Sequence, residues 1–298
     1  MTTATVTTER PDGLCRVTID LDGAWCYRAL HGVNQARDAH GCDDCFDSDD
    51  DAILDEGLPR FLDICERVGV RATLFVVGRD LGRPRFRESL EQAVAAGHRL
   101  MSHSFSHRYD LAALAPGDIV VDLERAASLI AQVSGTAPVG FRAPGYTTSP
   151  ALWQALVQTG HRWSSSGVPS PPYLGAKRAV ATWARLHGRR SASQRGSVRA
   201  YSPWFERPPP PLVEVPITTA LGLPWLGTTV ALLPDAAAAA LTSLAVATTP
   251  PEALVFELHL ADFADGRHLP AAQPDATVPL AAKCARLERA LRAIAAAG

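Results

Sequence analysis

The sequence predicts an α/β protein built on parallel strands, arranged either as a barrel or as a doubly wound sheet. Two observations lead to this prediction. Short apolar, β-rich runs alternate along the chain with longer segments of helical periodicity, which is typical of parallel strands joined by crossover helices. Polar motifs also follow four of the predicted strands, at the ends where active sites of parallel α/β proteins assemble.

The first half of the chain supplies three strand–helix units. Residues 15–21 read as a strand, and the apolar stripe of residues 55–68 predicts a helix that ends at Gly69. The apolar run 73–77 predicts a second strand, followed by a helix over 84–96 that ends at Gly97. Residues 98–101 lead a third strand into a histidine-containing motif, and a helix is expected over 117–133.

The second half continues the alternation around one irregular segment. Strands are predicted at 139–141 and 255–259, and helices at 150–158, after Asp235 and at 279–297. Residues 169–216 are rich in proline, and we interpret them as a long excursion from a single domain that spans residues 1–298. Trp225 and the tryptophans of this excursion are expected to shape a pocket.

Composition and charge exclude several classes of protein. The 298 residues are 47% hydrophobic and 20% charged, which excludes a disordered chain. A net charge of −2 gives no electrostatic reason to expect nucleic acid as a partner. No run of about 18 apolar residues predicts a transmembrane segment, and the N-terminus does not read as a signal peptide. With few cysteines, the sequence is expected to be cytoplasmic, with reduced thiols.

Two motifs together predict a metal site. Asp20 and Asp22 lie two residues apart at a strand end, where both point to one side. A cation relieves the repulsion between such carboxylates, although a simple Asp-Gly turn is the structural alternative. His103 and His107 have the four-residue spacing of two ligands to one divalent metal, although chance pairs of loop histidines are common. Two histidines with one carboxylate form a ligand set that leaves positions open for water.

Two further motifs add groups for acid–base chemistry. Arg142 follows a strand, beside a Pro-Gly turn. It could be a plain surface residue, or it could keep a catalytic carboxylate ionised by pairing with it. His259 ends another strand, and a lone histidine there is more often structural.

Two other features are interpreted as loops. Cys42 and Cys45 form a Cys-x-x-Cys segment, but no second pair completes a four-ligand zinc site, so free thiols in a loop are expected. Asp47, Asp49 and Asp51 imitate the start of a calcium loop. Because the later positions lack the required glycine and glutamate, we interpret this acidic run as a solvated loop.

The four motifs resemble those of the polysaccharide deacetylases, carbohydrate esterase family 4. Residues 18–23 are similar to the first family motif in a form with one residue between its aspartates. Residues 103–107 match its His-Ser-x-x-His motif, residues 142–146 its Arg-x-Pro motif, and residues 258–259 its Leu-His motif. The resemblance covers residues from about 15 to 265 and implies a distorted (β/α) barrel.

The resemblance also implies a ligand set and a mechanism. One divalent metal ion, with zinc expected, would be held by Asp22, His103 and His107. Asp20 would be the general base, Arg142 would orient it, and His259 would be the general acid. The fourth family motif carries an aspartate that tunes the last histidine, and the corresponding residues 163–166 contain no acid. Either Asp262 has this role or His259 is tuned less.

The activity implied is hydrolysis of an N-acetyl group, with an acetylated sugar, glycoconjugate or lipid-linked sugar as substrate. Tyr146, Pro144 and Trp163 are expected to contribute to substrate binding. A hydrolase of a non-sugar amide or cyclic imide would use the same catalytic set and is a second hypothesis. A non-catalytic carbohydrate-binding protein is a third, and it would tolerate loss of Asp20 or His107.

Overall fold

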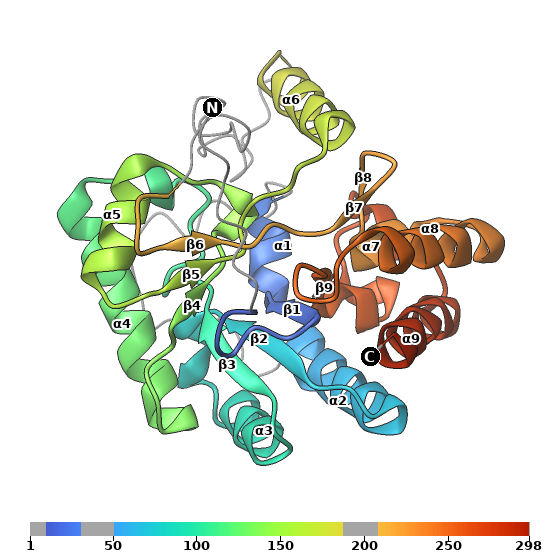
Figure 1. Ribbon diagram of the computed structural model, residues 1–298, viewed down its shortest axis with the longest axis horizontal. Coiled ribbons are helices and arrows are strands. Elements are labelled where there is room, and N and C mark those ends of the chain that lie inside the picture. Colours follow the sequence, from blue (N-terminus) through green and yellow to red (C-terminus); the bar gives the residue numbers. More distant parts are fainter. Residues whose placement is uncertain (1–9, 31–50, 187–207, 298) are drawn as a thin grey trace.

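The computed structural model describes residues 10–30, 51–186 and 208–297, whose strands form one curled sheet and a small hairpin (Figure 1). The main sheet has seven strands in the order β6-β5-β4-β3-β2-β1-β9, and all neighbouring strands are parallel. Its strands are β1 (Val17–Leu21), β2 (Ala72–Val76), β3 (Arg99–Ser102), β4 (Gly140–Phe141), β5 (Trp163–Ser164), β6 (Val213–Glu214) and β9 (Phe256–His259). The antiparallel hairpin consists of β7 (Thr219–Ala220) and β8 (Leu223–Pro224).

The gap between the edge strands β6 and β9 is bridged by the chain that follows β6. The N–H of Ile217 donates to the carbonyl of Gly167 at 2.8 Å, and the N–H of Thr218 donates to the carbonyl of Val255 at 3.0 Å. Leu226 then forms a single parallel bridge with Glu257. The sequential strand order and this bridging confirm the distorted (β/α) barrel and exclude the doubly wound alternative.

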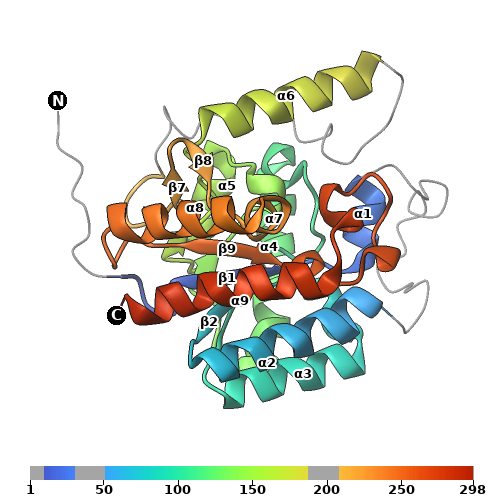
Figure 2. The ribbon, with the colours of Figure 1, turned by 90° about the vertical axis from the view of Figure 1, so that its right-hand side faces the viewer.

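Helices cover the outer face of the sheet. In Figures 1 and 2, α2, α3 and α9 lie beside one another outside β1 and β2, and α4 and α5 cover β3 to β5. The helices are α1 (Ala24–Leu30), α2 (Leu58–Val68), α3 (Pro84–Ala95), α4 (Pro116–Ser134), α5 (Pro150–Gln158), α6 (Pro171–Leu186), α7 (Gly227–Leu232), α8 (Asp235–Thr248) and α9 (Leu280–Ala296). The helices predicted from periodicity are confirmed, including the end of α2 at Gly69, which has a φ of 76°.

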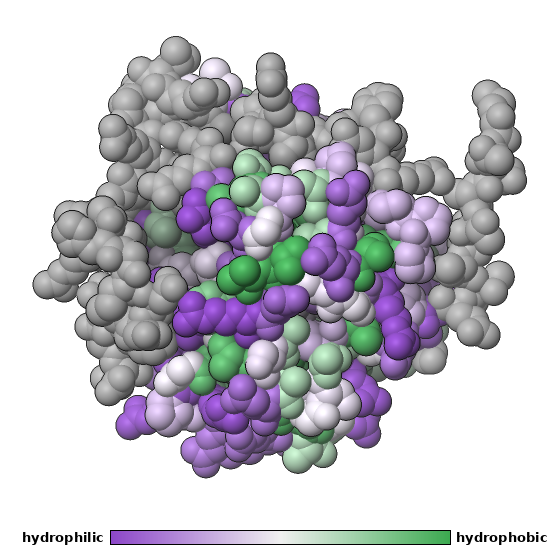
Figure 3. All heavy atoms as spheres, turned by 90° about the vertical axis from the view of Figure 1, so that its left-hand side faces the viewer, coloured by the Kyte–Doolittle hydropathy of each residue, from purple (hydrophilic) through white to green (hydrophobic). Residues whose placement is uncertain are grey.

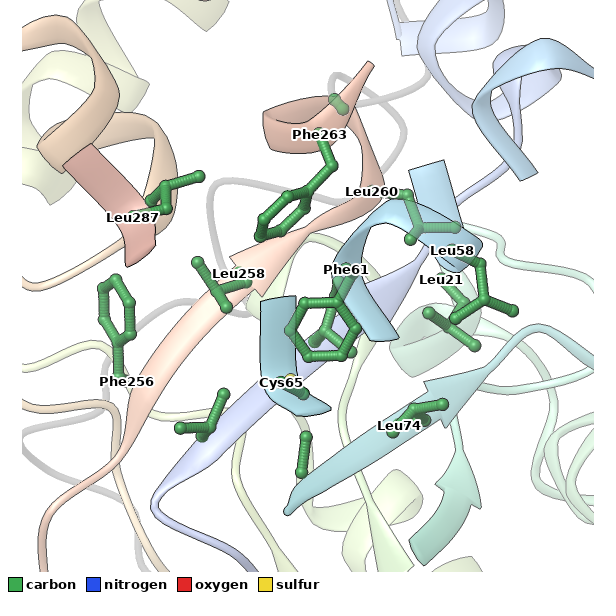
Figure 4. Packing of buried hydrophobic residues seen from close by; sticks show 14 of the residues in the cluster. Leu21, Leu58, Phe61, Cys65, Leu74, Phe256, Leu258, Leu260, Phe263 and Leu287 are labelled. Atoms are coloured by element: carbon green, nitrogen blue, oxygen red, sulfur yellow. The ribbon is translucent and has the colours of Figure 1, made fainter. Parts of the chain in front are cut away.

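Alternation along the strands separates the helix-facing core from the barrel interior. Val17, Ile19 and Leu21 of β1 belong to the main apolar cluster that packs against the helices. Figure 4 shows Leu21 beside Leu58 of α2. Strand side chains alternate between faces, so Thr18 and Asp20 point the other way, into the barrel. In β9, Phe256 and Leu258 face the helices (Figure 4), which leaves Glu257 and His259 on the interior face.

The barrel interior is filled by a second apolar cluster, which includes Phe75, Met101, Trp163, Ile217 and Val255. Several of these side chains come from strands whose other face packs against the helices, as expected where both faces of a parallel sheet are covered. The interior is therefore a packed core that also holds buried polar side chains, among them Thr18, Asp20 and Glu257.

The segment interpreted as an excursion contributes to the main sheet. Residues 169–216 contain α6 and also β6, which pairs with β5. Periodicity could not reveal strands of two residues. Trp225 is fully buried and stacks on Phe256 with ring centroids 4.3 Å apart, so its expected place in a pocket was wrong. Trp204, Cys42 and Cys45 lie outside the described residues.

The surface over α4 and α5 is mixed in character. Figure 3 shows small apolar groups separated by polar residues on this face. Val121 of α4 is exposed, and single exposed apolar residues of this kind are ordinary on a protein surface. Among the described helices, none is both long enough and apolar enough to cross a membrane.

Candidate metal centre and active site

Side chains from four strand ends meet at one mouth of the barrel. Asp20 lies near the end of β1, and Asp22 follows that strand directly. His103 follows β3, Arg142 follows β4, and His259 ends β9. These strands are parallel neighbours or near neighbours, so their carboxyl ends point the same way. The structure thus brings together residues separated by up to 239 positions in the sequence.

Asp22, His103 and His107 form a compact group of possible metal ligands. Each offers one ligand atom, and the three atoms lie within 4.8 Å of one another. Oδ1 of Asp22 is 3.1 Å from Nε2 of His107 and 3.5 Å from Nε2 of His103. All three residues are buried, with exposures of 4% or less.

The tight loop after β3 turns both histidines toward Asp22. Ser104 and His107 have positive φ angles of 66° and 47°, a conformation that non-glycine residues adopt only where the surroundings hold them. The hydroxyl of Ser104 accepts the N–H of His107 at 2.9 Å. The carboxylate of Asp122, on α4, accepts the N–H groups of Phe105 and Ser106 at 2.8 and 3.1 Å.

A hydrogen bond fixes the His103 ring. Nδ1 of His103 lies 2.8 Å from the carbonyl oxygen of Arg142. A carbonyl can only accept, so Nδ1 carries the proton and the lone pair of a neutral ring is on Nε2. This arrangement is typical of metal-bound histidines, whose second nitrogen donates to a neighbouring oxygen.

The electrostatics of the group suit a cation. Burial lowers the pKa of His103, which keeps its ring neutral. Burial alone would raise the pKa of Asp22, but the imidazoles of His107 and His103 outweigh it and hold the pKa below its usual range. Burial alone would lower the pKa of His107, but the neighbouring Asp22 carboxylate outweighs it and raises the pKa of His107. A bound cation would displace that proton.

The three residues fit one divalent metal ion. Oδ1 of Asp22 is buried and accepts no hydrogen bond of good geometry from the described residues, although two imidazole nitrogens face it. Two imidazoles and one carboxylate provide the nitrogen and oxygen ligands of open, catalytic sites. The structure therefore supports the predicted ligand set.

The chain after Asp22 packs against His107 through Trp25. Trp25 of α1 contacts the His107 ring edge-on, with centroids 5.9 Å apart, and its Nε1 donates to Asp80 at 3.0 Å. The carboxylate of Asp51 accepts the N–H of Ala24 at 2.8 Å. Asp51 is 3% exposed, so its interpretation as part of a solvated loop was wrong. Asp47 and Asp49 lie outside the described residues.

Arg142 is a buried connector between strands. Its Nη1 donates to Oδ1 of Asp20 at 2.8 Å, and its Nη2 donates to the hydroxyls of Thr18 and Ser165 at 3.0 Å each. Nε donates to the carbonyl of Ser165 at 2.8 Å. The side chain is fully buried, so the alternative of a surface arginine is wrong. Its charge and its fork of donors fix the carboxylate of Asp20.

His259 faces Asp20 across the mouth. Its Nε2 is 3.9 Å from Oδ2 of Asp20 and 3.4 Å from the hydroxyl of Tyr146. The side chain is 21% exposed, whereas that of Asp20 is 2% exposed. Burial opposes protonation of His259, but the carboxylates of Glu257 and Asp20 outweigh it and raise its pKa to about 9. His259 is therefore charged at neutral pH.

The acidic neighbour of the His259 ring was not predicted. Oε1 of Glu257 lies 3.0 Å from Nδ1 of His259. Asp262, the acid considered from the sequence, accepts the backbone N–H of His259 at 2.9 Å and the hydroxyl of Thr228 at 2.9 Å. One signal could have revealed Glu257. Residues two apart on a strand share a face, so Glu257 is expected on the same side as His259.

The loop at residues 144–146 brings Tyr146 to the mouth. Gly145 has a φ of 59°, and a Cβ atom there would lie 2.3 Å from the ring of Tyr109, so this turn requires glycine. Pro144 is buried in the same turn. The ring of Trp163 does not reach the mouth. Trp163 is 1% exposed, and its Nε1 donates to the carbonyl of Asp12 at 2.9 Å.

Comparisons with known proteins point to one family. The family model described as polysaccharide deacetylase matches residues 45–164. A peptidoglycan deacetylase of Helicobacter pylori (strain ATCC 700392 / 26695) is 30% identical over 110 residues, which are 37% of this chain. That alignment spans only 36% of the length of the relative.

The fold has a counterpart that covers nearly the whole chain. A crystal structure of a Mycobacterium smegmatis protein assigned to the polysaccharide deacetylases superimposes with a TM-score of 0.54 and 18% sequence identity. The superposition covers 96% of this chain and 86% of the other. At this level of identity the likeness concerns the fold.

Proposed function

Because the polysaccharide deacetylase family model matches residues 45–164, we propose that the chain belongs to this family and is a metal-dependent N-deacetylase. The reaction is hydrolysis of the acetamide of an N-acetylated sugar or glycoconjugate, in which water and amide give acetate and a free amine. One observation carries the proposal. The possible metal ligands, a fixed carboxylate and a charged imidazole meet at one mouth, and amide hydrolysis needs these three groups.

The ligand role belongs to Asp22, His103 and His107. A divalent cation held there supplies Lewis acidity for the carbonyl and for the water. Zinc is the metal that we propose, since nitrogen and carboxylate donors in an open set suit it. His103 supports this assignment because its Nδ1–H donates to the Arg142 carbonyl and fixes the ring.

The proton acceptor in the proposed reaction is Asp20. Its Oδ1 accepts from Arg142 at 2.8 Å, so the guanidinium sets the orientation of the carboxylate. Its Oδ2 lies 3.7 Å from Nε2 of His103, beside the ligand group. Oδ2 thus remains free of the arginine to take a proton from the attacking water.

The proton donor in the proposed reaction is His259. Its raised pKa keeps the imidazolium available at neutral pH, and its partial exposure at the mouth gives the leaving nitrogen access to Nε2. Transfer of this proton turns a poor leaving group into a neutral amine. The hydroxyl of Tyr146 is 3.4 Å from the same nitrogen, which supports a role for Tyr146, with Pro144 behind it, in positioning the substrate.

The remaining assignments are proposals on the same basis. The whole chain acts as one catalytic domain, and the substrate is an acetylated sugar, glycoconjugate or lipid-linked sugar met in the cytoplasm.

An acetate-release screen tests the proposal. Metal-stripped protein is given N-acetylglucosamine oligomers, a lipid-linked N-acetyl sugar, peptidoglycan, simple amides and a cyclic imide, before and after zinc is restored. We expect acetate release from at least one N-acetyl sugar, only with metal. Turnover of the non-sugar amide or imide alone would favour the alternative hydrolase, and binding without turnover would favour a carbohydrate-binding protein.

A further inference from the structure

Glu257 is a buried carboxylate with one charged partner close to it. It is fully buried on the interior face of β9. Neither of its carboxylate oxygens accepts a hydrogen bond of good geometry from the described residues. Oε1 lies 3.0 Å from Nδ1 of His259. A buried carboxylate without hydrogen bonds is costly unless a nearby charge compensates it, and the imidazolium is that charge.

The position of Glu257 is set by the backbone. The strand alternation that sends Phe256 and Leu258 to the helices sends Glu257 inward. Leu226 pairs with Glu257 in a parallel bridge, so the chain that closes the barrel also covers it. The carboxylate is therefore held on the buried interior face of the barrel wall.

Other charged groups face this pair from neighbouring elements. Asp20 of β1 and Arg142 after β4 lie on its interior side, and Asp262 lies in the turn after β9. The carboxylate of Asp262 accepts the backbone N–H of His259 at 2.9 Å. Asp262 thus positions the main chain, whereas Glu257 places its carboxyl group next to the ring. Burial raises the pKa of this carboxyl group, and the charge of His259 acts in the opposite direction and favours its ionised form.

We propose that Glu257 is the positioning residue that keeps His259 charged and aimed at the leaving nitrogen. This inference rests on the proposed function, because it assigns Glu257 to the acid half of that reaction. Residues 163–166, in and directly after β5, carry no acid, and a glutamate two residues before the histidine, on the same strand, takes that place instead.

A competing possibility is that the same residues bind a second cation. Ligand atoms of Asp20, Glu257 and His259 also lie within 4.8 Å of one another. However, Arg142 already donates to Asp20 at 2.8 Å, so a positive charge occupies one side of this group. We therefore expect one metal ion per chain, and a second ion that disappears in Glu257→Gln would overturn the proposal.

The direct test is the titration of the His259 ring by NMR in the zinc-loaded protein, which does not depend on turnover. In Glu257→Gln, we expect the midpoint to fall by about one pH unit or more, because a neutral amide replaces a charge in contact with the ring. Glu257→Asp keeps the charge at a greater distance, so its midpoint should lie between those of Glu257→Gln and the wild type. Asp262→Asn is the matched control, and its shift should be smaller than that of Glu257→Gln.

A kinetic comparison separates proton donation from general damage to the site. An N-acetyl amine needs a proton on its leaving nitrogen, whereas the phenolate of an aryl acetate departs without one. We expect Glu257→Gln to lower amide turnover by about 10²-fold and to leave aryl acetate turnover within about threefold of the wild type.

Two outcomes would overturn the inference while leaving the proposed function in place. One is equal loss of amide and aryl acetate turnover with an unchanged His259 midpoint. The other is a larger midpoint shift in Asp262→Asn than in Glu257→Gln. Absence of turnover in the wild type would instead contradict the proposed function, and the NMR titration would still decide whether Glu257 acts on His259.

Discussion

Arg142 and Asp20 form a fully buried ion pair, with Nη1 of the arginine 2.8 Å from Oδ1 of the aspartate. Arg142 follows β4 and Asp20 lies in β1, and these two strands are separated in the sheet by β3 and β2. The guanidinium therefore spans the barrel interior, where it also donates to Thr18 and Ser165. The pair links the stability of the barrel to the geometry of the proposed base.

Removal of the arginine should destabilise the fold as well as the site. In Arg142→Ala the buried carboxylate of Asp20 loses its counter-charge, so we expect the free energy of unfolding to fall by about 3–5 kcal/mol. Arg142→Lys keeps a charge but not the fork of donors and should lose less stability. Denaturant unfolding measures both variants, and a loss below about 1 kcal/mol in Arg142→Ala would contradict the structural role.

A second buried pair, away from the proposed reacting groups, gives a reference for this effect. Nζ of Lys283 is 3.0 Å from Oδ2 of Asp275, and both side chains are fully buried. Lys283→Met should cost about 3–5 kcal/mol, because it leaves Asp275 unpaired. The double change Lys283→Met with Asp275→Leu should recover most of that loss, as measured by denaturant unfolding. A double variant no more stable than Lys283→Met would show that the charge pair is not the cause.

The acid sensitivity of the fold should depend on His161. Burial lowers its pKa to about 4, whereas the unfolded chain binds the proton near its ordinary value of about 6.5. Between these values the unfolded state holds the extra proton, so stability falls as the pH falls. From pH 7 to pH 5 we expect a loss of about 2 kcal/mol from this residue.

The matched variant for this prediction is His161→Asn, which can keep the contact that Nδ1 makes with the hydroxyl of Thr159 at 2.9 Å. Urea unfolding of the metal-free proteins at both pH values gives the comparison. The variant should lose less stability than the wild type on acidification. Equal losses would place the acid sensitivity elsewhere.

The sequence predicts the site residues better than it predicts the short strands β5 and β6 of the barrel. Asp20, Asp22, His103 and His107 were recognisable because each motif follows a strand of at least four residues. In β5 and β6 the strands have two residues each, too few for alternation to be seen. Tertiary pairing with neighbouring strands, and not local propensity, makes them strands.

The residues that were missed are buried polar groups whose partners are distant in the sequence. Asp51 was assigned to a solvated loop, although its carboxylate accepts the N–H of Ala24, 27 positions away. Glu257 was passed over because a single acid in an apolar strand has no recognisable motif. The role proposed for Glu257 depends on two contacts, the backbone bridge to Leu226 and the approach to the His259 ring. Only the folded structure shows these contacts.

Metal binding should depend on His107 and not on every buried histidine. His107→Ala removes one of three proposed ligands, so metal content and turnover should fall together. His98 is the control, because it precedes the opposite end of β3, where its Nδ1 accepts the N–H of Ala72 at 3.1 Å. His98→Ala should keep its metal. Full metal occupancy of His107→Ala by elemental analysis would remove His107 from the ligand set.

The central claim is that Asp20 and Asp22, two residues apart, have different roles. Asp22 faces both imidazoles, whereas Asp20 is held by Arg142. Asp22→Ala should therefore lose metal and activity together. Asp20→Asn keeps the size of the side chain and all three ligands, so it should retain metal while turnover falls by about 10²–10⁴-fold.

Metal content and acetate release, measured on the same samples of Asp20→Asn, test this account most directly. The account predicts one metal ion per chain, as in the wild type, together with the loss of turnover. A metal-free Asp20→Asn protein would make Asp20 a ligand, and near-normal turnover with metal bound would show that Asp20 is not the base. Either result would contradict the account.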